Sequence, residues 1–307
     1  MRRPRLATLG VLATVGVGAF AADIAQARDC DRACAQAVSD AAFAAFQAGD
    51  PGKVLRGVRV TENGRDIRLA DSQLHAITRV RYTRTFIEAA AGAVGVYGAA
   101  DAAGGPTVYS LRLKLKGDRV IEAETVVTRR SEASLFAPET MAGKPEWDQE
   151  LAPGRRTPRE AMIAAANAYF DGIEAESGAN VPAAPTCNRY ENGVKTTNRP
   201  GGPQEGCKGL GGFSYIERIR DRRVPLIDES RGLIWALVVF DIPGGRYTAT
   251  VGGKFQQLKR EPRSVLIGEL FKIEAGQIQD IEVVMRNVPL GASSGWAPPK
   301  PPKAKKT

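Results

Sequence analysis

The sequence predicts an α+β protein made of two tandem copies of one domain, in each of which a curved antiparallel sheet wraps around N-terminal helices. Two observations lead to this fold class. In each half a helical pattern comes first, and a short strand and a long meander of strands follow it. Three sequence blocks also occur twice in the same order, which indicates a duplication with a period of roughly 120 to 140 residues. The matched blocks are Ile87–Gly92 with Asp101 and Ile227–Gly232 with Asp241, Glu62–Gly64 and Glu191–Gly193, and Leu113–Leu115 and Phe271–Ile273.

The chain begins with a pattern typical of a targeting segment. Three arginines precede an uncharged run from Leu6 to Ala22, and Ala25–Ala27 is a small-x-small cleavage site. Ala19–Ala21 offers a second cleavage position. The apolar run is short for a membrane span. We therefore expect residues 1–27 to be a signal peptide and the mature protein to be periplasmic or secreted, without membrane insertion.

The first copy (residues 28–130) and the second copy (residues 157–290) have the same predicted plan, joined by a linker rich in Pro and Gly at residues 131–156. In the first copy we expect a helix at Ala35–Ala48 and strands at Val58–Thr61, Ala93–Ala99, Val108–Lys116 and Arg119–Thr128.

The second copy opens with the capping box Thr157–Glu160, which starts a helix that ends near Gly178. Leu233–Phe240 is an unbroken apolar run, which is typical of a strand covered on both faces. The remaining expected elements are a short strand at Asn188–Asn192, a second helix at Phe213–Ile219, and strands at Val265–Ile273 and Gln277–Arg286.

The cysteine content fits an oxidising compartment. Four cysteines in an exported chain favour disulfides. Cys187 and Cys207 enclose a loop rich in Gly, Pro and Asn, so we expect them to be bridged. Cys30 and Cys34 lie at the start of a helix, so their pairing depends on local geometry. A zinc site would need histidines, and since His75 is the only one we expect no metal.

The basic charge is concentrated at the two ends of the chain. The formal charge is +9 and falls to +7 without residues 1–27; it falls to +3 without the four lysines of the Pro/Lys-rich tail at residues 291–307. A nucleic-acid-binding protein would concentrate Lys and Arg with aromatics on one face. No such stripe is visible in the sequence, so we expect no nucleic-acid partner.

The order of elements resembles that of the nuclear-transport-factor-2-like superfamily, also called SnoaL-like or ketosteroid-isomerase-like. Within it, Arg189–Asn198, Ile219–Arg223, Asp228–Gly232 and the ending Val288–Trp296 resemble an exported bacterial and fungal family of unknown function. The resemblance covers most of the second copy and, more weakly, the first. It implies two cone-shaped domains with a pocket inside the sheet. It implies no single activity, because the superfamily includes isomerases, dehydratases, cyclases and non-catalytic binders.

Residues that only the second copy has are the candidates for chemistry. Glu269 interrupts the apolar face of the strand Val265–Ile273, where the first copy has Leu111. Desolvation would raise its pKa and suit it to general acid or base catalysis. The alternatives are a buried salt bridge to an arginine, or a bulge that turns Glu269 outward. Tyr169, where the first copy has Ala42, is the second catalytic candidate, or else a core aromatic residue.

Five further residues are candidates for ligand binding. Arg189 and Arg222 could clamp a carboxylate or phosphate, or could instead pair with Glu191, Asp221 or Asp228. Glu191 and Asn192 have counterparts in the first copy, Glu62 and Asn63, so the alternative to ligand binding is a turn at the end of a strand. Trp235 is the fifth candidate for ligand binding. The carboxylates Glu122, Glu124, Asp280 and Glu282 alternate with apolar residues and are expected on a solvent-facing strand face.

Two functions are compatible with these residues. One is a lyase, isomerase or dehydratase without a cofactor, acting on a small carbonyl compound in the second copy. The other is a non-catalytic module of the cell envelope that binds a small organic ligand or another protein. In either case the duplication could leave the chain monomeric, or it could form a homodimer.

Overall fold

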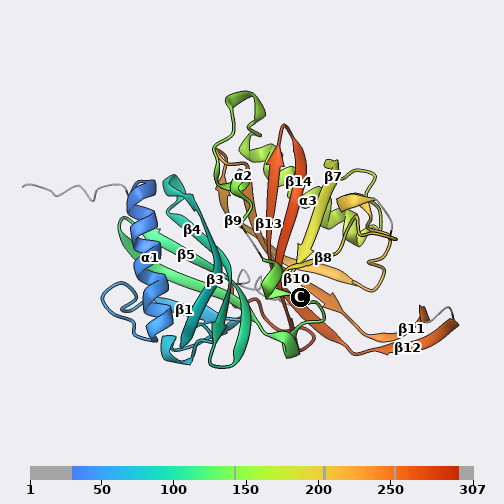
Figure 1. Cartoon of the computed structure of the whole chain (residues 1–307), viewed down its shortest axis with the longest axis horizontal. Helices are drawn as coiled ribbons and strands as arrows, with labels where there is room; N and C mark the ends of the chain where they lie inside the picture. Colours follow the sequence, from blue (N-terminus) through green and yellow to red (C-terminus); the bar gives the residue numbers. More distant parts are fainter. Residues whose placement is uncertain (1–29, 142, 203–204, 252–253, 297–307) are drawn as a thin grey trace, which may run out of the picture.

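The computed structural model describes residues 30–141, 143–202, 205–251 and 254–296, and it consists of two α+β units that lie side by side (Figure 1). Each unit has one long helix and a six-stranded sheet. The predicted signal peptide and the lysine-containing part of the tail lie outside the described residues. Among the described residues, no helix is long and apolar enough to cross a membrane, and no cluster of His, Cys, Asp and Glu has a geometry that could hold a metal ion.

The two sheets have the same strand order. The first is ordered β2-β1-β6-β5-β4-β3 and the second β8-β7-β14-β13-β10-β9, so equivalent strands occupy equivalent positions. In both, the short strand after the helix pairs in parallel with the last strand, and the other neighbours are antiparallel. The first unit contains α1 (Arg32–Ala48), β1 (Arg59–Glu62), β2 (Arg65–Asp66), β3 (Ile77–Glu88), β4 (Ala93–Ala102), β5 (Gly105–Lys116) and β6 (Arg119–Thr128).

The second unit adds a hairpin that projects from the body of the molecule (Figure 1). This hairpin consists of β11 (Gly245–Val251) and β12 (Lys254–Arg260) and pairs with neither large sheet. A short helix, α2 (Pro145–Asp148), lies in the linker. The other elements of the second unit are α3 (Arg159–Glu174), β7 (Ala183–Glu191), β8 (Val194–Lys195), β9 (Arg218–Asp228), β10 (Leu233–Ile242), β13 (Arg263–Glu274) and β14 (Gln277–Val288). Single 3₁₀ turns are η1 (Leu69–Asp71), η2 (Ala89–Ala91), η3 (Arg130–Glu132), η4 (Pro138–Thr140), η5 (Pro153–Arg155) and η6 (Gly206–Lys208).

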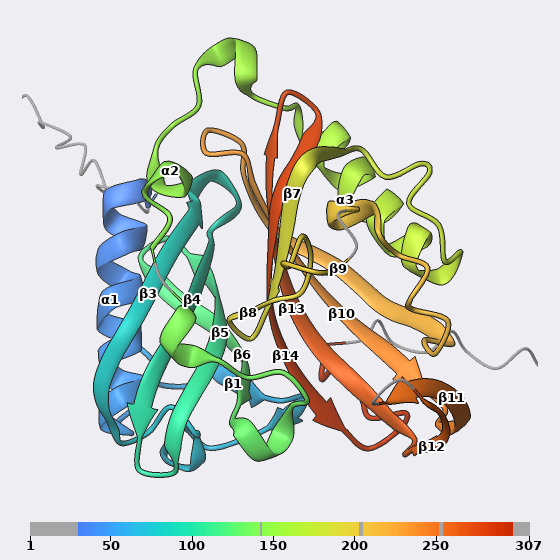
Figure 2. The same cartoon turned by 45° about the vertical axis from the view of Figure 1, so that its right-hand side comes forward.

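Three apolar clusters hold the fold together. In each unit one cluster fills the space between the long helix and the concave face of its sheet. The third cluster joins the convex faces of the two sheets. At its centre the Trp235 ring meets Phe86 and Tyr97 of the first copy, with ring centroids 5.5 and 6.0 Å apart. The sheets therefore pack back to back, with α1 and α3 on the outer sides (Figure 2).

The contacts between the copies are reciprocal. Arg32, the first residue of α1, pairs with Asp228 of the second copy at 2.9 Å. Arg159, the first residue of α3, pairs with Glu88 of the first copy. Equivalent strands also meet, since β3 lies against β9 and β6 against β14. The arrangement is that of a two-fold symmetric dimer, in which the same patch on both partners forms the interface.

The shared Glu-Asn-Gly motif forms a tight turn in each copy. Asn63 and Gly64 have φ of 52° and 78°, and Asn192 and Gly193 have φ of 47° and 89°. Two positive φ angles between paired strands are typical of a type I′ turn, for which Asn-Gly is the preferred sequence. The tight turn therefore explains why the Asn-Gly pair occurs in both copies.

Each turn is also covered by an arm from the other copy. A Cβ atom at Gly193 would meet the carbonyl oxygen of Ala137, in the segment that follows β6. At Gly64 it would meet the carbonyl oxygen of Ser293, in the segment that follows β14. The described part of the second arm includes Trp296, whose indole N–H donates to the Thr61 hydroxyl at 2.7 Å. The sheets thus exchange arms across the interface.

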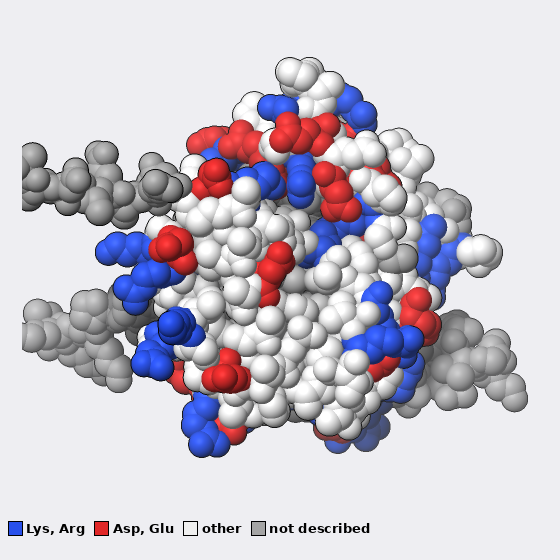
Figure 3. Space-filling model, turned by 60° about the vertical axis from the view of Figure 1, so that its left-hand side comes forward, with Lys and Arg blue, Asp and Glu red and all other residues white. Residues whose placement is uncertain are grey.

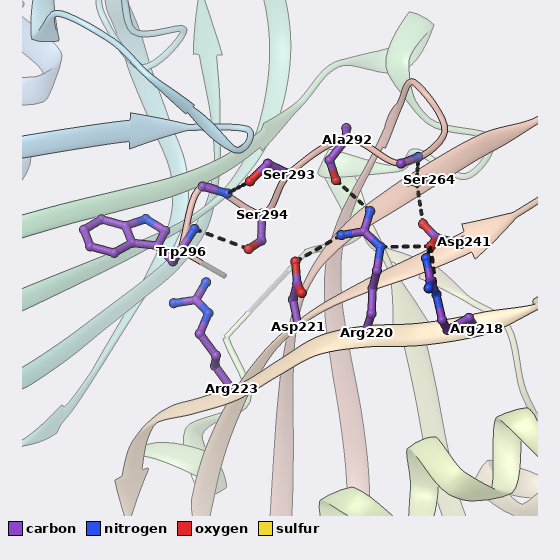
Figure 4. Close-up of polar contacts among 12 residues, drawn as sticks. Arg218, Arg220, Asp221, Arg223, Asp241, Ser264, Ala292, Ser293, Ser294 and Trp296 are labelled. Atoms are coloured by element: carbon purple, nitrogen blue, oxygen red, sulfur yellow. Dashed lines mark hydrogen bonds and ion pairs between the residues drawn. The ribbon is translucent and has the colours of Figure 1, made fainter. Parts of the chain in front are cut away.

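Polar contacts fix the second arm to its own sheet before it crosses (Figure 4). Arg220 on β9 donates to the carbonyl oxygen of Ala292 at 2.6 Å and to the Asp241 carboxylate at 2.9 Å. The backbone N–H of Gly291 donates to the Ser264 hydroxyl at 2.8 Å. Hydrogen bonds from arginines and Ser264 oppose the effect of burial and lower the pKa of Asp241 to about 2. These contacts hold the arm against β9 and β13.

Several expectations from the sequence were wrong. Phe213–Ile219 is not a helix, because it forms turns that lead into β9. The side chain of Thr157 does not cap α3; it accepts a hydrogen bond from the backbone N–H of Gly276 at 2.9 Å. Glu124 and Glu282 do not face solvent, since they are 6% and 8% exposed. Their strand face is covered by the other copy.

The cysteines form two disulfides, Cys187–Cys207 and Cys30–Cys34. The first confirms the expected pair and ties the loop that precedes η6 to β7. The second lies at the start of α1, where the carboxylate of Asp31 caps the helix by accepting from the backbone N–H of Cys34 at 2.9 Å. Two disulfides are typical of proteins in an oxidising, non-cytoplasmic compartment.

Figure 3 brings the side of the first copy forward and shows a broad area with few charged side chains. Helix α1 on this side carries only two charged residues, Arg32 and Asp40. Charged groups of both signs gather along the edges of this face (Figure 3). They do not form the one-signed stripe typical of a surface that binds nucleic acid.

Candidate functional site

The second copy has a pocket between its helix and the concave face of its sheet. It holds about 710 Å³ of empty space, including its open mouth. Apolar side chains make up most of its wall, which is typical of sites for small organic ligands. The polar side chains that reach it are Tyr169 from α3, Arg189 and Glu191 from β7, Tyr215 from the loop before β9, Arg263 and Glu269 from β13, Asn287 from β14, and Ser134 from the linker.

Glu269 lies on the concave face of β13 and lines this pocket. Its neighbours at alternate positions, Val265, Ile267 and Phe271, belong to the core cluster around α3, as the alternation of a strand requires. Glu269 is 2% exposed. No Lys, Arg or His in the described parts of the chain lies within ion-pair distance of its carboxyl group. Neither an outward bulge nor a direct salt bridge therefore accounts for this residue.

A chain of polar contacts leads from Glu269 to the strand β7. The hydroxyl group of Tyr169 lies beside the Glu269 carboxyl group and favours its ionised form. Nη1 of Arg189 donates to the Tyr169 hydroxyl oxygen at 3.1 Å. Nε of Arg189 donates to Glu191 at 2.8 Å. The structure thus brings four residues predicted from the sequence, Glu269, Tyr169, Arg189 and Glu191, to one wall of the pocket.

The surroundings of Glu269 favour its neutral form. Burial raises the pKa of Glu269 to about 8, and the nearby charge of Glu191 acts in the same direction. The charge of Arg189 and the hydrogen bond from Tyr169 oppose this rise. A carboxyl group with a pKa near neutral exchanges protons readily at physiological pH. Burial also raises the pKa of Tyr169, so its hydroxyl group stays protonated and can donate a hydrogen bond.

Three other residues predicted for ligand binding do not line this pocket. The amide of Asn192 is fully used, since it bonds the backbone of Leu135 and both backbone groups of Met285. Arg222 forms ion pairs with carboxylates of α3. Trp235 lies on the opposite face of β10, within the interface between the sheets. We leave these three residues out of the proposed site.

Two further residues of the pocket, Arg263 and Phe213, were not predicted from the sequence. Arg263 lies on the same face of β13 as Glu269, and its Nε donates to the amide oxygen of Asn287 at 3.2 Å. The alternation that placed Glu269 inside extends back to position 263 and could have indicated this arginine. Phe213 lies under the guanidinium of Arg189, 4.8 Å from the ring centroid. Phe213 lies in an irregular loop, where the spacing of apolar residues does not predict which side chains are buried.

The first copy has no polar group at the equivalent places. Leu111, Val60 and Ala42 take the positions of Glu269, Arg189 and Tyr169, and all three belong to the core cluster around α1. The polar chain is therefore particular to the second copy.

A family model described as "Domain of unknown function (DUF8021)" matches residues 155–285, which include most of the second copy. A comparison with curated proteins finds no match.

Among solved structures, similarity is low. A protein described as a "putative polyketide cyclase" from Silicibacter sp. TM1040 is 14% identical, with a TM-score of 0.29, over 41% of this chain and 90% of that chain. AclR from Streptomyces galilaeus, described as a "putative hydroxylase", is 14% identical, with a TM-score of 0.30, over 43% and 83%. A de novo designed protein with a curved β-sheet is 12% identical, with a TM-score of 0.27, over 42% and 87%. Similarity at this level supports no inference about activity.

Proposed function

We propose that this chain is an exported SnoaL-like protein whose second copy acts as an isomerase, lyase or dehydratase without a cofactor. The substrate class is a small, partly apolar carbonyl compound. One observation carries the proposal: the carboxyl group of Glu269 is buried in the wall of an apolar pocket, with a tyrosine hydroxyl as its polar partner and a pKa of about 8. A general acid or base works best with a pKa near the working pH.

The proposed reaction begins with proton removal. The ionised Glu269 takes a proton from the carbon next to the substrate carbonyl group. The electron pair of the broken C–H bond forms a carbon–carbon double bond, and the carbonyl π electrons move to the oxygen to give an enolate. The Tyr169 hydroxyl, which Arg189 holds in place, donates to the enolate oxygen.

The same proton completes the reaction. Glu269 returns it to a different carbon in an isomerisation, or to a leaving hydroxyl group, which departs as water in a dehydration. Every proton and electron pair is accounted for within the substrate and one carboxyl group. Glu191 is a positioning residue in this scheme, because it holds Arg189 at 2.8 Å.

The test is exchange of α-protons for deuterium in simple ketones, with cyclohexanone and 2-cyclohexenone as probes, followed by NMR in D₂O. We expect the wild-type protein to accelerate exchange and Glu269→Gln to lose about 10²- to 10⁴-fold of this rate. Glu124→Gln is the matched control, because Glu124 is a buried glutamate on the convex face of the first sheet and does not line this pocket. Equal rates in wild type and Glu269→Gln would refute the proposal. Thermal stabilisation of both proteins by the probes, without exchange, would instead favour a binding protein.

A further inference from the structure

A second pocket lies between the two copies. It holds about 600 Å³ of empty space. Tyr82 on β3 and Tyr97 on β4 line it from the first copy, and Tyr190 on β7 and Glu282 on β14 line it from the second. Figure 2 shows β3 and β4 facing β7 and β14 across this junction. The linker contributes Lys144. The pocket is separate from the one that contains Glu269, apart from Val283, which lines both.

Glu282 is an incompletely paired carboxylate in the wall of this pocket. The residue is 8% exposed. Its Oε1 lies 3.3 Å from Nζ of Lys144. Its Oε2 is buried and has no hydrogen-bond partner among the described residues. A buried acceptor without a partner is costly, and a ligand that donates a hydrogen bond would relieve that cost.

The cations around Glu282 are fewer than the carboxylates they face. Lys144 is shared between Glu282 and Asp280, at 3.3 and 3.2 Å. Arg84, the other cation near Glu282, already pairs with Asp148 at 3.0 Å. Two cations thus face three carboxylates.

The first copy supplies an internal comparison. The carboxylates equivalent to Asp280 and Glu282 are Glu122 and Glu124. They are paired with two guanidinium groups: Arg112 contacts both carboxylates, and Arg223 contacts Glu124 at 2.6 Å. Where the first copy has Arg112, the second has Leu270, which faces Glu282 across β13 and β14. In the second copy the cation that contacts both carboxylates is therefore not a strand arginine but Lys144 of the linker.

The aromatic lining suits a cation. The ammonium group of Lys144 already lies over the Tyr190 ring, 4.1 Å from its centroid. Two further tyrosine rings, of Tyr82 and Tyr97, line the same space. Aromatic faces attract cations through their quadrupole, and more strongly when the site excludes water.

We propose that this junction pocket binds a small organic cation, a primary amine that carries an apolar group. The ammonium group donates to the unpaired oxygen of Glu282, and the apolar group packs against the tyrosine rings. The inference does not depend on the proposed function of the other pocket.

The test uses benzylamine, which is an ammonium ion at pH 7, and benzyl alcohol as its neutral counterpart. Binding to the full chain is measured by isothermal titration calorimetry. We expect benzylamine to bind at least about tenfold more tightly than benzyl alcohol, because a hydrogen bond to a charged group contributes about 1.5–3 kcal/mol. Glu282→Gln should remove that difference, and Glu124→Gln should keep it.

Two further variants keep the proposal falsifiable if Glu282→Gln does not fold. Lys144→Met removes the competing cation and should tighten benzylamine binding. Unchanged or weaker binding in that variant would overturn the proposal. Glu269→Gln should still bind benzylamine, and a loss there would place the amine in the other pocket. Equal affinity for the amine and the alcohol, or no binding of the amine, would also overturn it.

Discussion

The two copies differ most clearly at one buried position, which is a leucine in the first copy and a glutamate in the second. Leu111 and Glu269 occupy the same position on equivalent strands, and both are almost fully buried. Burying a leucine stabilises the fold. Burying a carboxyl group opposes folding whenever the group must ionise. The second copy therefore carries a destabilising residue where the first carries a stabilising one, as is typical of functional sites.

The destabilisation that results from burying Glu269 should depend on pH. The pKa of Glu269 is raised from its ordinary value of 4.5 to about 8. Below pH 4.5 the group is neutral in both the folded and the unfolded chain. Between pH 4.5 and 8 only the unfolded chain loses the proton, so stability falls as the pH rises. At about 1.4 kcal/mol per pH unit, this window corresponds to about 5 kcal/mol.

Glu269→Gln should therefore be more stable than the wild type above pH 8, by up to about 5 kcal/mol. Below pH 4.5 the two proteins should have similar stability. Urea unfolding at a series of pH values measures this difference. A difference that does not change with pH would show that Glu269 is not neutral in the folded protein.

Tyr169→Phe should raise the pKa of Glu269 further. The variant removes a hydroxyl group that favours the ionised carboxylate. If Glu269 acts first as a base, the rate of α-proton exchange rises with pH to a plateau above about pH 8 in the wild type. In Tyr169→Phe the midpoint should move to higher pH. A lower rate with an unmoved midpoint would mean that Tyr169 does not contact the reacting carboxyl group.

Alternation along one strand predicted the place of Glu269, but not its partners. A strand with apolar residues at every second position fixes which face an intervening residue occupies. The unbroken apolar run that contains Trp235 has no such alternation, so its face could not be predicted. The contacts of Glu269 with Tyr169, and of Tyr169 with Arg189, join α3, β7 and β13, and no local pattern encodes them.

Among the elements, strands rich in arginine were the hardest to predict. β9 contains Arg218, Arg220, Arg222 and Arg223, which resembles a solvated charge run. In the structure these side chains are paired: Arg218 and Arg220 with Asp241, Arg222 with α3, and Arg223 with the first copy. Strand β3 of the first copy was missed for the same reason. Local charge obscures a strand whose partners are distant in sequence.

The exchanged arms make a prediction about the tight turns. Gly193→Ala should destabilise the protein by more than the strain of a positive φ alone, which is about 1–2 kcal/mol, because the added Cβ would meet the Ala137 carbonyl. Gly276→Ala is the matched control: Gly276 has φ of 78° in a similar turn, but nothing lies within 4 Å of the new atom. Urea unfolding compares the two. Equal losses would mean that the arm does not press on the turn.

At the scale of the molecule, the duplication replaces a dimer interface. The convex sheet faces, which would be exposed in a single copy, pack against each other through the cluster that contains Phe86 and Trp235. The reciprocal ion pairs Arg32–Asp228 and Arg159–Glu88 join the ends of the equivalent helices to the opposite copy. The arm that ends at Trp296 then lies across the first copy (Figure 4).

We therefore predict that the mature chain is a monomer. In the described residues only three large apolar side chains are exposed, Val80, Ile121 and Leu290, and isolated residues of this kind do not make an interface. Sedimentation velocity should give the mass of one chain across the micromolar range.

Trp235→Ala removes the ring that lies between Phe86 and Tyr97 and should lower the free energy of unfolding by about 3–5 kcal/mol. Because the cluster joins both copies, this loss should destabilise both copies together in one calorimetric transition. Two separate transitions in the wild type, or a stable dimer, would mean that the interface between the copies does not couple them as these contacts indicate.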